Sequence, residues 1–153
     1  MARIDFAFGA PDRLKTACVI ARKRFLEGQR VIVYCTDARR LTTFDRLLWT
    51  FDPTSFIPHV ASEDPLSDQT PIVLYKTHPF SVLDRWPAEP KPWLLNLDDD
   101  CAPEIEQFER VMEVVSQADD ERQVARGRWR TYAAAGHEVH AHDLTKAKSE
   151  AAE

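Results

Sequence analysis

The sequence predicts an α/β protein, a single three-layer sandwich built around a mainly parallel β-sheet. Short apolar, β-branched runs such as residues 30–36 and 72–76 are typical of strands that are covered on both faces. Segments with helical apolar spacing separate several of these runs, and alternating strands and helices favour parallel pairing. The 153 residues are 44% hydrophobic and 29% charged, a composition typical of one soluble globular domain. We expect residues 1–144 to form this domain and residues 145–153 to form a frayed tail.

The first half of the chain is expected to contain two strand–helix units. The expected elements are a strand at residues 4–8, a turn at 9–12, a helix at 13–27, a strand at 30–36 and a second helix with the apolar stripe Leu41, Phe44 and Leu48. Gly28 fits the C′ position of the first helix, and Asp37 can cap the second. Residues 55–59 fit a short strand, and the acidic residues 61–71 predict a loop.

The second half is expected to add the remaining strands and one more helix. The expected elements are strands at residues 72–76, 93–97, 109–115 and 138–144, a turn of helix near 103–107 and a helix at 121–136. Residues 77–92 contain four prolines and should be irregular. The apolar residues of 104–115 fit both a strand and a helix spacing, and we favour a turn of helix followed by a strand. Asp119 and Asp120 are expected at the N-cap of the last helix and Gly136 at its C′ position.

Hydropathy, charge and cysteine usage exclude several classes of protein. No run approaches the about 20 apolar residues of a membrane span, and the N-terminus has no signal-peptide pattern. Cys18, Cys35 and Cys101 form no CxxC motif, so we expect neither a disulfide framework nor a zinc site. The net charge of −5 argues against broad nucleic-acid binding. We therefore expect a cytoplasmic protein that binds no membrane and does not bind DNA tightly by itself.

The most informative segment is residues 121–136, which contains four arginines and one glutamate. Arg122, Arg126 and Arg130 are spaced i, i+4, i+8, so they form one row on a helix, with Trp129 beside it. Arginines next to an aromatic ring suit an acidic, partly apolar ligand, such as a carboxylate, a phosphate or an acidic peptide tail. The alternative is a solvated arginine face over core aromatic residues, and the pattern by itself leaves both interpretations open.

A second candidate surface lies in residues 48–59, which combine large apolar side chains with two prolines. A loop cannot bury Trp49, Phe51, Phe56 and Ile57 all on one side, although core packing would explain some of them. Part of this apolar area is therefore expected to be exposed and to bind a partner.

Motifs for catalysis and nucleotide binding are weak. The first strand–turn–helix contains only Gly9, with neither a GxGxxG nor a GxxxxGK[ST] motif, so no nucleotide cofactor is expected. Residues 98–100 are three aspartates that close the strand at 93–97 and could hold Mg²⁺. A solvated, helix-capping turn is the favoured interpretation of these aspartates, because no phosphate-binding loop accompanies them. We therefore expect no catalytic residues.

Motifs for metal binding and for a catalytic nucleophile are also weak. His137, His140 and His142 lie close in the sequence, but no thiolate or carboxylate completes a ligand set. Cys35 ends a strand and has no histidine at a motif spacing. No metal and no cofactor are therefore expected.

Taken together, these segments resemble the chi subunit family of bacterial DNA polymerase III. The matching segments are residues 4–8, 25–33, 45–49, 55–59, 113–115 and 125–136. The most specific part is Leu48-Trp49 followed by Ser55-Phe56-Ile57-Pro58-His59, and the resemblance spans almost the whole chain. It implies a Rossmann-like α/β fold without catalytic activity, and an accessory role in the clamp-loader assembly. The loops at 61–71 and 77–92 look longer than the family core requires.

The resemblance also implies one ligand and the residues that bind it. The ligand is the acidic C-terminal tail of single-stranded DNA-binding protein, which docks on the basic helix in this family. Arg126 is then the main anchor, Arg122 and Arg130 are auxiliary cations, and Trp129 and Val115 are apolar walls. Trp129 stands where the family often has tyrosine.

A second implied partner is the psi subunit, or a helicase in some bacteria. Trp49, Phe51, Phe56 and Pro58 match the surface that binds these partners, although psi is not found in every lineage that has chi. The expected function is a non-enzymatic adaptor that links the replicase to protein-coated single-stranded DNA. The alternative is a small α/β enzyme that acts on an acidic or phosphorylated metabolite through residues 98–100.

Overall fold

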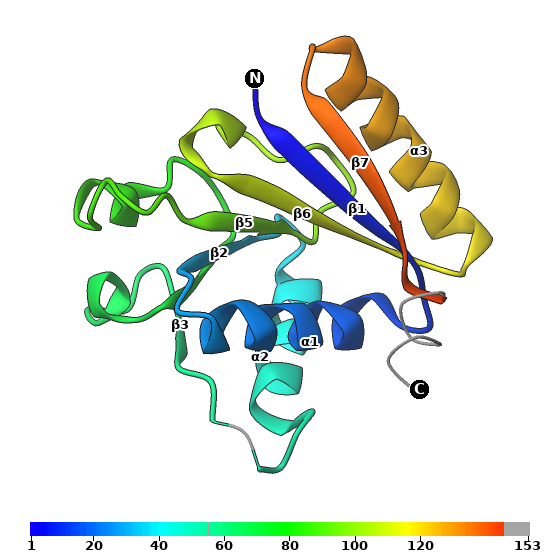
Figure 1. Ribbon diagram of the computed structural model, residues 1–153. Coiled ribbons are helices and arrows are strands. Elements are labelled where there is room, and N and C mark those ends of the chain that lie inside the picture. Colours follow the sequence, from blue (N-terminus) through cyan, green and yellow to red (C-terminus); the bar gives the residue numbers. More distant parts are fainter. Residues whose placement is uncertain (55, 146–153) are drawn as a thin grey trace.

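A computed structural model, which describes residues 1–54 and 56–145, shows a central sheet with helices on both faces (Figure 1). This arrangement confirms the predicted α/β sandwich. The frayed tail expected at residues 145–153 lies, apart from Thr145, outside the described residues. None of the described helices is long and apolar enough to cross a membrane.

The sheet has seven strands in the order β3-β4-β2-β5-β6-β1-β7, and every neighbouring pair is parallel. The strands are β1 (Arg3–Ala10), β2 (Val31–Tyr34), β3 (His59–Ala61), β4 (Ile72–Tyr75), β5 (Trp93–Asn96), β6 (Arg110–Ser116) and β7 (Glu138–Asp143). The central strands are apolar and buried along their length, as predicted for strands covered on both faces.

Two helices cover one face of the sheet and a third covers the other. The helices are α1 (Arg13–Leu26), α2 (Ala38–Thr50) and α3 (Asp119–Ala134). The predicted stripe of α2 packs with α1 and the inner strands in one apolar cluster. On the other face, α3 shares the cover with the irregular segments before and after β5, which contribute Phe80, Trp86 and Phe108 to a second cluster. Figure 1 shows α3 beside β7 and on the side of the sheet opposite to α1 and α2.

Several predicted boundaries are confirmed by the backbone. Asp37 caps α2, because its carboxylate accepts the backbone N–H groups of Arg39 and Arg40 at 3.0 and 3.2 Å. Gly28 and Gly136 follow α1 and α3 in the left-handed region, with φ of 80° and 88°. The favoured interpretation of residues 104–115 is also right, since a 3-10 turn at Ile105–Gln107 precedes β6.

Two other predictions are wrong. A short strand was expected at residues 55–59, of which residue 55 lies outside the described residues; the strand observed is β3 (His59–Ala61), because Pro58 has no N–H to donate and pairing begins after it. The N-cap of α3 is Ala118, which makes no side-chain capping bond, so Asp119 and Asp120 lie in the first turn instead. There their carboxylates lie near the positive end of the helix dipole.

Candidate functional site

A groove lies between α3 and the sheet and has a volume of about 290 Å³. We call it the α3 groove. It is lined by Phe6, Phe8, Val115, Arg122, Ala125, Arg126, Trp129 and Arg130. The structure therefore brings together all five residues that the sequence analysis assigned to a tail-binding site, and adds Phe6, Phe8 and Ala125.

The floor of the α3 groove is aromatic and aliphatic. Phe6 and Phe8 are two residues apart on β1, so their side chains point to the same face of the sheet. The Phe6 ring is 3% exposed and lies 5.1 Å from the Trp129 ring, centroid to centroid. Val115 on β6 pairs in register with Phe8 and is also buried. The alternation of Ile4, Phe6 and Phe8 was the sequence signal that could have identified this part of the floor.

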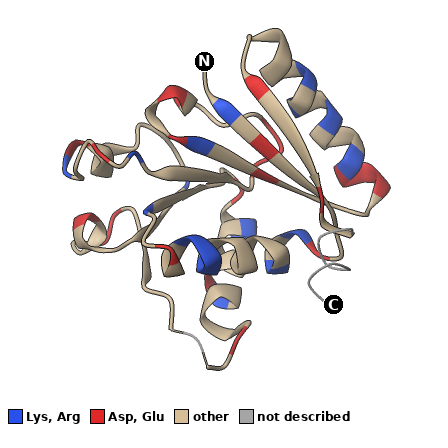
Figure 2. Ribbon diagram, in the orientation of Figure 1, with Lys and Arg blue, Asp and Glu red and all other residues tan. Residues whose placement is uncertain are grey.

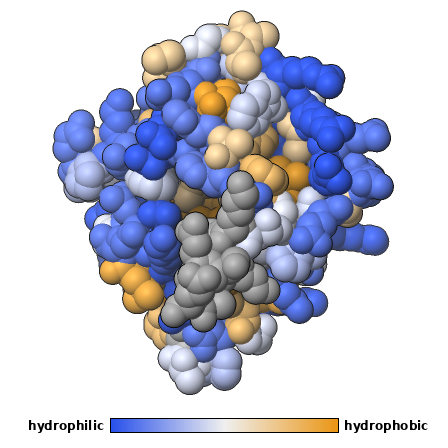
Figure 3. Space-filling view, turned by 45° about the vertical axis from the view of Figure 1, so that its right-hand side comes forward, coloured by the Kyte–Doolittle hydropathy of each residue, from blue (hydrophilic) through white to orange (hydrophobic). Residues whose placement is uncertain are grey.

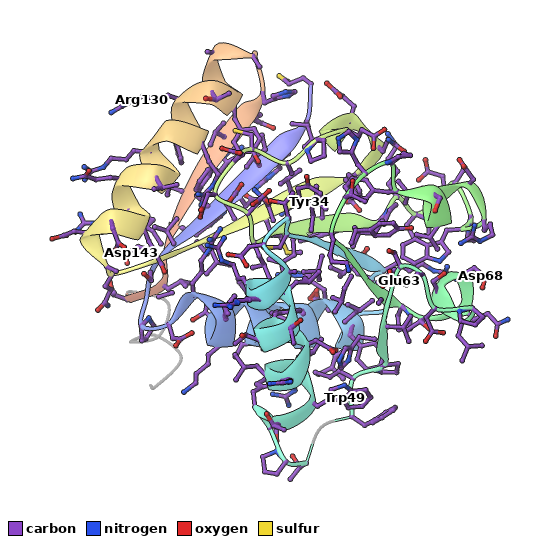
Figure 4. All side chains as sticks on the ribbon, turned by 180° about the vertical axis from the view of Figure 1, so that it is seen from behind. Tyr34, Trp49, Glu63, Asp68, Arg130 and Asp143 are labelled. Atoms are coloured by element: carbon purple, nitrogen blue, oxygen red, sulfur yellow. The ribbon has the colours of Figure 1, made fainter. Side chains whose placement is uncertain are left out.

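The rim of the α3 groove is cationic. Arg122, Arg126 and Arg130 are exposed in one row along α3, as their spacing predicted. Arg122 lies 3.5 Å from the Asp119 carboxylate, whereas Arg126 and Arg130 make no ion pair within residues 1–54 and 56–145. Figure 2 shows this basic row along α3 after an acidic first turn, and Figure 4 shows Arg130 extending outward from the helix. In Figure 3, hydrophilic side chains cover the right-hand side of the molecule, with hydrophobic ones beside them.

The fourth arginine of α3 is not part of this rim. Arg128 is 4% exposed, and its Nε donates to Glu113 on β6 at 3.0 Å. The Glu113 carboxylate also accepts hydrogen bonds from Asn96 at 2.7 Å and from the Tyr132 hydroxyl at 2.8 Å. Burial raises the pKa of Glu113, and the neighbouring Arg128 opposes this shift. The sequence analysis missed this pair, although a glutamate inside the apolar run of β6 was a signal for it.

A second candidate surface lies where α2 ends, at the opposite end of the molecule from Arg130 (Figure 4). Trp49 is 48% exposed and Phe56 is 69% exposed, and their ring centroids lie 5.5 Å apart. We call this pair the Trp49–Phe56 surface. Phe51 and Pro58 are half-buried, with Phe51 packed against the apolar cluster under α1 and α2. Ile57 is fully buried in that cluster, so it contributes to the core and not to the exposed area.

His59 is a buried residue that packs against the Trp49 ring. Its side chain is fully buried, and its ring centroid lies 4.4 Å from that of Trp49. One ring nitrogen lies 2.7 Å from the Ile57 carbonyl oxygen, and the other lies 2.8 Å from the Asp45 carboxylate. These contacts join β3 to α2 and fix the position of the Trp49 ring. The sequence analysis gave His59 no role beyond the family motif.

The aspartates at residues 98–100 belong to a turn whose polar groups are largely paired. The Asp98 carboxylate accepts the Thr36 hydroxyl at 2.9 Å and the backbone N–H of Asp99. Asp99 lies 3.2 Å from Arg40 of α2. The backbone carbonyls of Asp98 and Asp99 accept hydrogen bonds from Arg13 and Arg128, and that of Leu97, just before the turn, accepts one from Arg40. These contacts indicate a structural role for the turn.

The remaining candidate groups are dispersed. His142 lies 2.8 Å from the Asp5 carboxylate, His140 lies 3.3 Å from Glu138, and His137 accepts the backbone N–H of Ala2. Burial raises the pKa of the Cys35 thiol, which makes its thiolate less available. Within the described part of the chain, no group of three or more His, Cys, Asp or Glu side chains could hold a metal ion.

Comparison with known proteins assigns the family. The family model described as "DNA polymerase III chi subunit, HolC" matches residues 1–140. The DNA polymerase III subunit chi of Pseudomonas aeruginosa is 29% identical over 150 residues, which cover 95% of this chain and 99% of that relative. The protein of the same name from Escherichia coli is 29% identical over 124 residues, which cover 78% of this chain and 77% of the relative. The chain therefore belongs to the DNA polymerase III chi subunit family, and its role is that of an accessory subunit in DNA replication.

Proposed function

We propose that this chi-family chain is a non-enzymatic adaptor that binds the acidic C-terminal tail of single-stranded DNA-binding protein in the α3 groove. Through the rest of its surface it links that tail to the clamp-loader assembly of the replicase, in the cytoplasm. One observation carries this proposal. Arg126 and Arg130 have no acidic partner in the described residues, and they lie at the rim of a groove with an apolar floor.

The groove matches the chemistry of such a tail in two ways. The guanidinium groups of Arg126 and Arg130 can each form two parallel hydrogen bonds with a carboxylate. The floor of Phe6, Val115 and Trp129 can take up an apolar side chain next to that carboxylate, and about 290 Å³ is room for one large side chain. Arg126 is central in the row, so we assign it as the main anchor, with Arg122 and Arg130 as auxiliary cations.

The test is a titration with a fluorescein-labelled acidic peptide that ends in an apolar residue with a free carboxylate, followed by anisotropy. Arg126→Ala should weaken binding by about 1.5–3 kcal/mol, the range for a hydrogen bond to a charged group. Arg39→Ala is the matched control, because Arg39 is an exposed arginine on α2, far from the groove lining in sequence and structure. Wild-type affinity in the Arg126→Ala protein would contradict the assignment of this groove.

The Trp49–Phe56 surface is proposed as the contact for a second replication partner, the psi subunit where it exists or a helicase. The two exposed rings are in contact, and a contiguous exposed apolar patch is typical of an interaction site, where aromatic residues often contribute much of the binding energy. Phe51 and Pro58 would line the edge of this contact, since each is half-buried and lies two residues from one of the exposed rings in the sequence.

A further inference from the structure

Helix α3 presents its arginines in two different ways. Arg126 and Arg130 reach solvent at the rim of the α3 groove, whereas Arg128, between them in sequence, is 4% exposed. Successive residues of a helix are about 100° apart, so residues two positions before and after Arg128 both lie about 160° away from it. The direction of Arg128 therefore determines where the two rim arginines point.

The inward direction of Arg128 is set by a carboxylate in the sheet. Glu113 is completely buried, and its two oxygens accept hydrogen bonds from Arg128, Tyr132 and Asn96. Arg128 and Tyr132 are four residues apart on one face of α3, so Glu113 holds that face at two points. Arg128 also donates through Nη1 to the carbonyl oxygen of Asp99 at 3.2 Å, a third contact from the same helix face.

We infer that Arg128 and Glu113 are positioning residues for the α3 groove. By fixing the rotation of α3, they orient Arg126 and Trp129 toward the bound peptide. The inference rests on the proposed function of the groove. A buried ion pair often adds little stability compared with an apolar pair of similar volume, because desolvation of both charges offsets their attraction. The Arg128–Glu113 pair instead fixes the rotation of α3 about its axis, since only one orientation of the helix gives Glu113 all of its hydrogen-bond donors.

Two variants separate orientation from stability. In the first, Glu113→Leu with Arg128→Met, both charges are replaced by apolar groups of similar size, so no unpaired charge is left buried. In the second, Arg128→Lys, the charge is kept but the planar fork that reaches both Glu113 and Asp99 is lost. Arg13→Lys is the matched control, because Arg13 is a similarly buried arginine of α1 that donates to the Val114 and Asp98 carbonyls.

Three quantities are measured for each protein, the last two of them at a temperature at which it is fully folded. They are the melting temperature, the Kd for the acidic peptide, and the nuclear Overhauser contact between the Phe6 and Trp129 rings. We expect both Arg128 variants to lose about tenfold in affinity and to weaken the ring contact, since a loosely held site binds poorly. We expect Arg13→Lys to melt at a lower temperature and to bind the peptide with wild-type affinity.

Wild-type affinity and an unchanged ring contact in either folded Arg128 variant would overturn the inference. If the double variant does not fold, Arg128→Lys alone decides. A lowered melting temperature with wild-type affinity in the folded protein would mean that the pair is only structural, and it would overturn the inference as well. If the wild-type protein does not bind the peptide, the proposed function fails. The Phe6–Trp129 contact then still reports whether Arg128 and Glu113 set the orientation of α3.

Discussion

The α3 groove and the Trp49–Phe56 surface differ in how they are built into the fold. The groove is concave and cationic, and two of its floor residues, Phe6 and Val115, belong to the apolar cluster beneath α3. The Trp49–Phe56 surface carries no charge, and its two rings are about half or more exposed. The groove is therefore partly made from the core, whereas the aromatic pair is added at the end of a helix.

This difference predicts how each region responds to substitution. A floor residue of the groove serves the fold and the ligand together, so its loss should affect stability and binding. The rim arginines and the aromatic pair are exposed, so their loss should leave the fold intact and, on the proposed function, weaken binding alone. On the proposed function, we also expect the two regions to differ in the force that drives binding, which should be electrostatic in the groove and mainly apolar at Trp49 and Phe56.

The largest expected effect is that of Phe6→Ala. Phe6 is 3% exposed and contacts the rings of Trp129 and Tyr132, so its truncation should lower the free energy of unfolding by about 3–5 kcal/mol. Phe8→Ala is the matched control on the same strand, because Phe8 is 40% exposed and should cost much less stability. Urea unfolding of both proteins measures the difference. An equally small loss for both variants would show that Phe6 is not part of the core.

The next effect concerns partner capture. Trp49→Ala with Phe56→Ala should abolish capture of the psi or helicase partner, because an interface aromatic contributes about 2 kcal/mol or more to binding. Tail binding and the melting temperature should change little, since both rings are exposed. The measurements are a melting curve and two pull-downs on the double variant. An unfolded variant would assign both residues to the core, and a folded variant that still captures the partner would place the interface elsewhere.

A smaller effect is expected from salt, and it should separate the two regions. Raising the ionic strength from about 0.1 to 1 M shortens the screening length from about 10 to 3 Å. Peptide binding in the α3 groove should therefore weaken, because it relies on exposed arginines, and partner capture at the Trp49–Phe56 surface should persist. Anisotropy and pull-down titrations at the two salt concentrations test this. Equal salt dependence at both regions would contradict the contrast drawn between them.

The smallest expected effect is on plain single-stranded DNA, for which we predict no tight binding. The net charge of the chain is −5, and the arginines that line the groove are confined to one helix, which gives few phosphate contacts. Electrophoretic mobility shifts with an unmodified oligonucleotide at physiological salt measure it. Submicromolar affinity without a protein partner would argue against the adaptor function.

The sequence by itself determined the features that depend on local periodicity. The buried strands β2, β4 and β5 were predicted from their apolar runs, and the stripe of α2 and the arginine row of α3 from their spacing. They were predictable because strand and helix geometry fix which residues of a segment share a face, whatever the segment packs against. The same reasoning correctly expected part of the apolar area at residues 48–59 to be exposed.

Only the tertiary structure decided which members of these patterns are buried. Arg128 and Arg126 look alike in the sequence, and Arg128 turned inward because Glu113 lies beneath it on a strand that is paired from another part of the chain. Ile57 was grouped with Trp49 and Phe56, yet it fills the core while they remain exposed. Asp119 and Asp120 are the first two residues of α3 and not its N-cap, since the turn after β6 places Ala118 at that position. For Arg128 and Ile57 the outcome depends on packing against other elements of the fold, which local spacing cannot encode.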